Sequence, residues 1–90
     1  MVTVSATIHN AFGIHVRPAA LIARELREYP GTIGVACPGG EPVDPKNILG
    51  LISLGLTCGQ QVDIRVDGPD AETMAARLVE LLQSRYDFPR

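Results

Sequence analysis

The 90-residue chain has few aromatic side chains and little excess charge. It contains two Phe, two Tyr and no Trp, and its eight Lys and Arg against ten Asp and Glu leave a net charge of −2 at pH 7. Proteins that bind nucleic acid need a basic surface, and those that hold single strands also need aromatic rings on which bases stack. The composition therefore argues against a nucleic-acid partner.

Cysteines, metal-ligand clusters and long apolar runs are also scarce. Cys37 and Cys58 are too few for a disulfide framework, and no group of His and Cys has zinc-site spacing, so we expect no metal. The most apolar run, residues 48–56, is far shorter than the ~20 residues that cross a bilayer. With no secretory leader at the start of the chain, we expect a cytoplasmic protein that does not insert into membranes.

The sequence does contain a regular succession of strand and helix patterns. Alternating apolar and polar residues predict half-buried strands, and apolar residues three or four apart predict amphipathic helices. In chain order we expect strand, helix, strand, brief strand, short helix, strand and helix, at residues 2–8, 16–28, 32–36, 41–43, 46–54, 61–67 and 71–85. Asp44 is expected to cap the short helix, and Gly55 to end it.

This order of elements predicts one α+β domain over residues 1–90, with residues 86–90 as a loose C-terminal tail. The first strand–helix–strand unit must leave a gap that a later strand fills. Strands with one wet face require helices on the other face. The expected architecture is therefore an open-faced two-layer sandwich.

A possible chemical site lies at the start of the first helix, in the sequence Gly13-Ile14-His15-Val16-Arg17-Pro18. The N–H groups at a helix start have no partner within the helix, and together with the helix dipole they attract phosphate. Arg17 adds a permanent cation, and an imidazole beside an anion site can accept and return a phosphoryl group. A histidine that merely caps or flanks the helix is the alternative interpretation of these residues.

Two segments resemble the histidine-containing phosphocarrier (HPr) family of the bacterial phosphoenolpyruvate-dependent sugar phosphotransferase system. Residues 13–20, Gly-Ile-His-Val-Arg-Pro-Ala-Ala, are similar to the family's phosphorylation-site signature. Residues 46–55, Lys-Asn-Ile-Leu-Gly-Leu-Ile-Ser-Leu-Gly, resemble its second signature, around a short middle helix. The resemblance covers almost the whole chain, and it implies a four-stranded antiparallel sheet with three helices on one face.

The resemblance also implies a function and roles for particular residues. His15 would take a phosphoryl group on its δ1 nitrogen from enzyme I, which draws it from phosphoenolpyruvate, and pass it to an enzyme II A component for sugar uptake. Arg17 would neutralise the phosphoryl charge, the N–H groups of Val16 and Arg17 would hold its oxygens, and Pro18 would frame the turn. The protein would be a phosphocarrier without a cofactor, and not an enzyme.

The second signature implies a docking surface for these partners. We expect the surface to comprise aliphatic residues near the site and basic residues on the outer side of the first helix: Ala20, Arg24, Arg27, Ile48, Leu49 and Ile52. Some of these aliphatic residues could instead belong to the core, and the arginines could form a solvated helix face with Glu28. A carrier that shuttles between partners is expected to be a monomer.

The chain departs from the family pattern at two positions. Carriers regulated by an HPr kinase have a serine at the start of the middle helix, where this chain has Asn47, which cannot be phosphorylated. The residue before Gly13 is often small and polar in the family, and here it is Phe12. Two alternatives stay open: a regulatory module of the same fold that does not serve sugar transport, and an interaction domain without phosphoryl chemistry.

Overall fold

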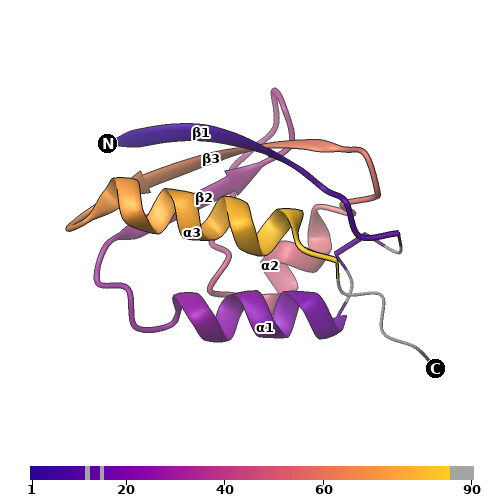
Figure 1. The fold of residues 1–90 in the computed structure, drawn as a ribbon, viewed down its shortest axis with the longest axis horizontal. Coiled ribbons are helices and arrows are strands. Elements are labelled where there is room, and N and C mark those ends of the chain that lie inside the picture. Colours follow the sequence, from indigo (N-terminus) through magenta and orange to yellow (C-terminus); the bar gives the residue numbers. More distant parts are fainter. Residues whose placement is uncertain (12, 15, 86–90) are drawn as a thin grey trace.

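The computed structural model describes residues 1–11, 13–14 and 16–85. Phe12, His15 and the expected tail at residues 86–90 lie outside the described residues. The described chain forms six regular elements, drawn in Figure 1: β1 (Val2–Thr7), α1 (Val16–Leu26), β2 (Thr32–Ala36), α2 (Ile48–Ser53), β3 (Gln61–Asp67) and α3 (Ala71–Gln83).

The sheet is antiparallel, with β3 between β1 and β2. Its register pairs Val4 with Ile64 on one side of β3 and Val35 with Ile64 on the other. The last long strand therefore fills the gap that the first strand–helix–strand unit leaves, as the sequence predicts. The three helices lie together on one face of the sheet (Figure 1), which confirms the open-faced α+β sandwich.

The expected fourth strand, at residues 41–43, is reduced to an isolated bridge between Val43 and Val35. Each of these two residues donates its N–H to the carbonyl of the other, at 2.9 and 2.8 Å. Pro42 has no N–H to extend the ladder, and the Asp44-Pro45 pair then turns the chain away. The sheet thus has three strands rather than the four that the family resemblance implies.

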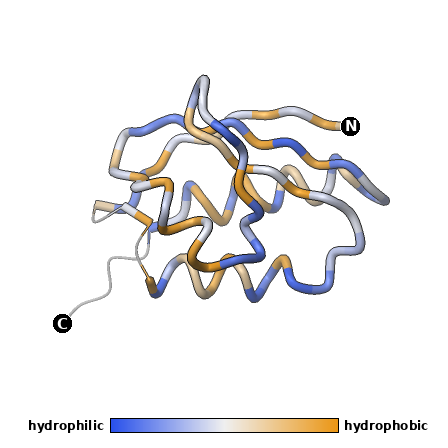
Figure 2. Tube along the Cα trace, turned by 180° about the vertical axis from the view of Figure 1, so that it is seen from behind, coloured by the Kyte–Doolittle hydropathy of each residue, from blue (hydrophilic) through white to orange (hydrophobic). Residues whose placement is uncertain are grey.

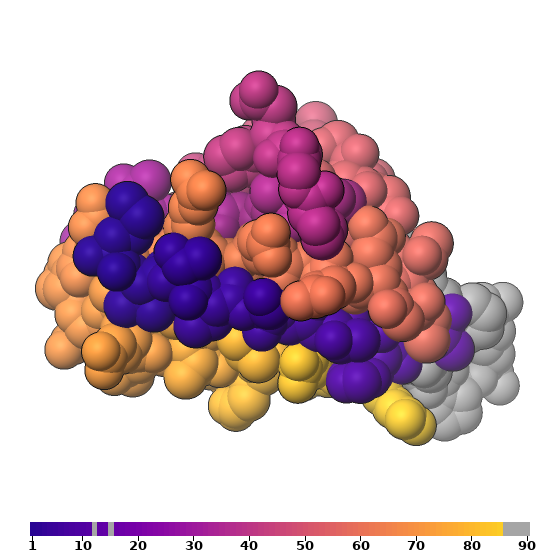
Figure 3. Space-filling view, turned by 90° about the horizontal axis from the view of Figure 1, so that it is seen from above, coloured from indigo at the N-terminus to yellow at the C-terminus, as the bar shows by residue number. Residues whose placement is uncertain are grey.

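The core lies between the sheet and the helices. The inward residues of the strands alternate with exposed ones such as Thr3, Ser5 and Arg65 on the open face, which no helix covers in Figure 3. Figure 2 shows hydrophobic and hydrophilic segments alternating along the helices as well. Side chains that are fully buried in this layer include Ile8, Ile22, Leu26, Leu51, Ile64, Leu78 and Leu82.

Helix α1 follows the predicted pattern closely. Its buried residues include Ala19, Ile22, Ala23 and Leu26, while the charged residues of the helix are exposed. The helix ends two residues earlier than expected, at Leu26, whose carbonyl accepts a hydrogen bond from the Tyr29 N–H at 3.1 Å. The apolar spacing therefore predicts the buried face of α1, although its last turn unwinds.

Helix α2 is shorter than the sequence predicts, because it begins at Ile48 rather than at Lys46. Its cap is Asn47, whose side-chain oxygen accepts from the Leu49 N–H at 3.0 Å. Asp44, the expected cap, instead accepts from the Lys46 N–H at 2.9 Å and closes the preceding turn. Gly55 ends the helix as expected, with a φ of 61° that favours glycine.

Candidate phosphoryl site and docking surface

The first turn of α1 carries three of the predicted site residues. Val16 and Arg17 are exposed, whereas Pro18 is buried against the core. Pro18 is tolerated there because an N–H in the first turn of a helix has no carbonyl partner within the helix. His15, the predicted phosphoryl acceptor, directly precedes this turn in the sequence and lies outside the described residues.

The electrostatics of this helix start favour an anion. The aligned peptide dipoles place a partial positive charge at the N-terminal end of a helix. Helix α1 has no acidic residue in its first turn that would offset this charge, and Arg17 adds a full cation. The end of α1 that follows His15 therefore offers N–H groups and a guanidinium, which are the donors that bind phosphate oxygens.

The segment before α1 is held against the loop between α2 and β3. The Ile8 N–H donates to the Gln60 carbonyl at 2.9 Å, and the Ile14 N–H donates to the Leu56 carbonyl at 3.1 Å. The side chain of Asn10 is fully buried, and its Nδ2 donates to the Gly13 carbonyl at 2.6 Å. The sequence analysis missed Asn10, because an asparagine in a loop carries no periodic signal that distinguishes a buried residue from an exposed one.

Helix α2 presents some of the predicted aliphatic docking residues to solvent. Leu49 is 74% exposed and Ile48 is 37% exposed. Ile52 is half-buried and packs against the core, as does the fully buried Leu51. Ala20 on α1 is half-buried as well. Of the aliphatic residues proposed for docking, Leu49 is therefore by far the most accessible.

Two further apolar side chains are exposed on α1, which contacts α2. Val16 is 65% exposed and Leu21 is 38% exposed. The sequence analysis did not predict Leu21 as a surface residue, and it assigned Val16 only a backbone role. The helical spacing marks the buried residues of α1 but does not show that apolar side chains also lie on its outer side.

The predicted basic residues Arg24, on α1, and Arg27, in the turn that directly follows α1, are both exposed. Neither takes part in the ion pairs of the described helices, which join Arg77 of α3 to Glu25 at 3.2 Å and to Glu80 at 3.5 Å. The hydrogen bond and the charge of Glu25 raise the pKa of Arg77 and keep it cationic. Arg24 and Arg27 are thus exposed where an acidic partner would meet them.

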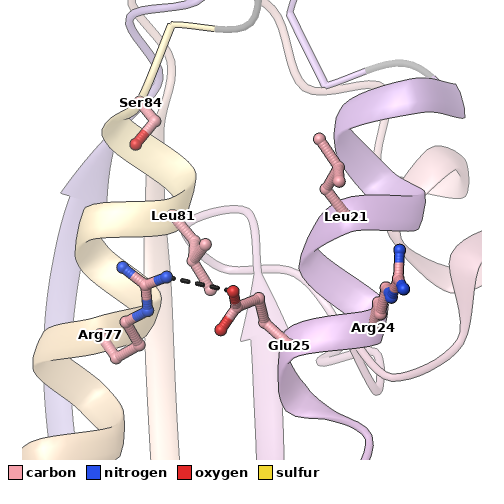
Figure 4. A pocket seen from close by; sticks show the side chains of 6 residues that line it. All are labelled: Leu21, Arg24, Glu25, Arg77, Leu81 and Ser84. Carbon is pink, nitrogen blue, oxygen red and sulfur yellow. Dashed lines mark ion pairs between the residues drawn. The ribbon is translucent and has the colours of Figure 1, made fainter.

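A groove of about 610 Å³ lies between α1 and α3. Figure 4 shows the Arg77–Glu25 ion pair crossing it, with Leu21 and Leu81 among the lining side chains. Among the described site residues, Val16, Arg17 and Pro18 do not line this groove. The ion pair links two helices across the groove, so its role is structural rather than part of the anion site.

Neither a metal cluster nor a membrane span is found in the part of the chain that the structure describes. Within it, no three His, Cys, Asp or Glu side chains lie close enough together to hold a metal ion. None of its helices combines the length and the apolar character that crossing a bilayer requires.

The chain matches the family model described as "PTS HPr component phosphorylation site" over residues 2–84. The phosphocarrier protein HPr of Borreliella burgdorferi is 34% identical over 84 residues, which cover 93% of this chain and 96% of that protein. The Mycoplasma genitalium phosphocarrier protein HPr is 32% identical, with 87% of this chain and 89% of that protein covered.

Solved structures share the fold over nearly the same extent. The phosphocarrier protein HPr from Bacillus anthracis superposes with a TM-score of 0.84 at 29% identity, covering 91% of this chain and 96% of that one. HPr-C-His from Thermoanaerobacter tengcongensis gives a TM-score of 0.82 at 34% identity, with 91% of each chain covered. These similarities define the class of protein, which is a phosphocarrier rather than a catalyst. The chain belongs to the HPr family of the phosphotransferase system.

Proposed function

We propose that this chain accepts a phosphoryl group on His15 from enzyme I and passes it to an enzyme II A component for sugar uptake. The observation that carries the proposal is the start of α1, where an exposed Arg17 and the positive end of the helix dipole directly follow His15 in the sequence. The family match over residues 2–84 supports the same position as the phosphorylation site.

The chemistry requires one bond to form and one to break at phosphorus. The lone pair of an imidazole nitrogen of His15 attacks the phosphorus atom that enzyme I carries, and the donor keeps the electron pair of the bond that breaks. The phosphoryl oxygens then carry about −2 charge beside the ring. The helix start and Arg17 stabilise this charge. In the second transfer a nucleophile of the II A component attacks the phosphorus, and the bond to the His15 nitrogen breaks with its electron pair returning to that nitrogen.

Enzyme I and phosphoenolpyruvate supply a direct assay of this proposal. The wild-type protein should gain ~80 Da in mass on incubation, as one phosphoryl group adds, and the label should be labile to acid and stable to base. The chain has two histidines, so His9→Ala is the matched control. The label should persist in His9→Ala and be absent in His15→Ala; a label retained by His15→Ala would refute the assignment.

Docking of both partners is proposed to use Leu49, Ile48, Ile52 and Ala20, with Arg24 and Arg27 meeting acidic groups on the partner. The exposure of Leu49 and the proximity of α2 to α1 support this surface. Exposed apolar side chains on a small protein commonly mark a partner site, and peripheral charges mainly set the encounter rate.

A charge placed on this surface separates docking from chemistry. We expect Leu49→Asp to raise the KM of enzyme I for the carrier about tenfold or more, because it puts a carboxylate in an apolar contact. Its thermal midpoint should stay near the wild-type value, since Leu49 is exposed. Ser5→Asp, on the open sheet face, is the control and should leave the KM unchanged. An equal KM for Leu49→Asp and wild type would place docking elsewhere.

The proposed carrier acts as a monomer, which a shuttle between successive partners requires. One similar structure is an HPr dimer from Thermoanaerobacter tengcongensis, with a TM-score of 0.66 and 34% identity. Sedimentation at micromolar concentration distinguishes the two states.

A further inference from the structure

The side chain of Asn10 is polar and fully inaccessible to solvent. A buried amide is costly unless its hydrogen bonds are satisfied. Its Nδ2 donates to the Gly13 carbonyl at 2.6 Å, and the Gly13 N–H donates back to the Asn10 carbonyl at 2.9 Å. Two reciprocal bonds thus close the turn between β1 and α1.

The peptide unit that joins Gly13 to Ile14 is held at both of its polar groups. Its carbonyl accepts from Asn10, and its N–H, which belongs to Ile14, donates to the Leu56 carbonyl at 3.1 Å. Gly13 has a φ of 70°, and a Cβ at this position would collide with the Leu56 carbonyl. The peptide plane therefore cannot rotate without breaking a hydrogen bond, and the loop at Leu56 leaves no room for a side chain at residue 13.

Ile14 links this peptide unit to the proposed phosphoryl acceptor, which is the next residue in the sequence, and then to the first turn of α1. Transfer between two proteins is sensitive to placement, because the reacting atoms must meet at contact distance and in line. A peptide held at both polar groups two residues before the helix is therefore suited to keep the start of α1 in place.

We propose that Asn10 is a positioning residue for phosphoryl transfer, acting through the Gly13–Ile14 peptide. The inference rests on the proposed function of His15. Removal of the Asn10 amide leaves the Gly13 carbonyl without its side-chain donor, and the peptide plane gains freedom to tilt. The consequence is slower transfer with unchanged docking, because the exposed apolar residues of α2 lie outside this turn.

The experiment compares variants of Asn10 with a core variant that is remote from the turn. Asn10→Ala removes the amide, and Asn10→Leu keeps its approximate size but removes the N–H donor. Val66→Ala is the control for general destabilisation, since Val66 is fully buried and pairs with Val2 at the far end of β1. Circular dichroism selects a temperature at which all four proteins are folded. If Asn10→Ala is too unstable, Asn10→Leu, which leaves no cavity, replaces it.

Two readouts are taken at that temperature: kcat and KM for phosphorylation by enzyme I, and hydrogen exchange of the Ile14 amide. Both Asn10 variants should lower kcat about tenfold or more, with KM unchanged, as a displaced acceptor would. Their Ile14 amide should exchange about tenfold faster, because its turn opens more often. Val66→Ala should retain both wild-type values.

A wild-type kcat in Asn10→Leu would overturn the inference, as would an equal loss of kcat in Val66→Ala. Unchanged exchange at Ile14 in the Asn10 variants would show that the amide does not hold the turn. A wild-type protein that takes no phosphoryl group would instead refute the proposed function itself. The exchange measurement therefore tests whether Asn10 holds the turn, and the labelling measurement tests separately whether the protein accepts a phosphoryl group.

Discussion

At the N-terminal end of α1 the side chains of Val16 and Arg17 are exposed. At its C-terminal end Leu26 and Tyr29 are buried, and Lys46 contacts the chain that follows the helix. Lys46 Nζ donates to the Tyr29 carbonyl at 2.6 Å and to the Gly31 carbonyl at 3.3 Å. It also lies 5.9 Å from the centroid of the Tyr29 ring.

The difference shows how one helix can serve both chemistry and stability. Carbonyl groups beyond the C-terminal end are met by a cation of the chain itself, as the helix dipole favours. The N-terminal end has no acidic residue in its first turn and presents an arginine. One end is thus neutralised within the protein, whereas the other gains most from an external anion such as a phosphoryl group.

The largest expected effect on stability comes from a charge placed at the buried C-terminal end of α1. Leu26→Asp should unfold the domain, lowering the free energy of unfolding by more than about 4 kcal/mol, because it buries an unpaired carboxylate. Thermal denaturation followed by circular dichroism checks this. Arg27→Asp, which places the same charge on the exposed side, should melt cooperatively near the wild-type temperature. A cooperative wild-type melt for Leu26→Asp would show that this end is not core.

At the N-terminal end of α1, Arg17→Ala should slow phosphoryl transfer without changing the stability of the fold. We expect phosphorylation by enzyme I to slow by about 10- to 100-fold, because a cation beside the transferred group is lost. The thermal midpoint should stay unchanged, since the side chain is exposed. Arg65→Ala removes the same charge from the open sheet face and should leave the rate unchanged. Equal rates for the two variants would remove Arg17 from the site.

A smaller effect on stability is expected at Lys46, which donates hydrogen bonds to the chain beyond the C-terminal end of α1. Lys46→Met keeps the aliphatic stem but loses both hydrogen bonds, so it should lower the free energy of unfolding by about 1–2 kcal/mol. Urea denaturation measures the change. Phosphorylation by enzyme I at 25 °C should proceed at the wild-type rate. A stability equal to that of wild type would mean that Lys46 does not hold this end.

The smallest effect is expected at Tyr29, whose buried hydroxyl has no hydrogen-bond partner among the described residues. Tyr29→Phe should leave the stability at pH 7 unchanged or raise it by up to about 1 kcal/mol, since an unsatisfied polar group is removed. Urea denaturation again measures the change. A loss of more than about 1 kcal/mol would show that the hydroxyl has a partner.

The same substitution should matter more at alkaline pH. Burial raises the pKa of Tyr29 in the folded protein, with further contributions from the charges of Asp67 and Asp70. The unfolded chain therefore loses this proton first, and the fold loses stability as the pH rises from about 10 through the folded pKa. Denaturation at pH 7 and pH 11 should show the Phe variant gaining on wild type at the higher pH. An equal difference at both values would contradict the shift.

Sequence periodicity was sufficient to predict α1 and α3 and the buried face of α1, because burial repeats with the geometry of each element. The short helix α2 was predicted from the residues expected at its ends. Periodicity failed where a single residue decides where a helix or strand begins or ends. The start of α2 depends on whether Asn47 or Asp44 accepts the first free N–H, and both have suitable side chains. The fourth strand depends on how far a ladder extends past Pro42, which pattern alone does not determine.

The candidate site was predictable in part. The motif around His15 predicts phosphoryl chemistry, and the exposed Arg17 at the start of α1 favours an anion there. The hydrogen bond from the Asn10 side chain to the Gly13 carbonyl was not predictable, because it depends on which loops pack together and not on any local repeat. The exposure of Leu21 and Val16 likewise depends on tertiary packing, which leaves one side of α1 uncovered.

Amide NMR spectra recorded before and after phosphorylation by enzyme I test the central claim most directly. The account predicts that the N–H signals of Val16 and Arg17 shift strongly when the phosphoryl group arrives, while those of Tyr29 and Gly31 stay in place. A phosphorylated protein whose Val16 and Arg17 signals do not move, or whose shifts centre on the Lys46 end of α1, would contradict it.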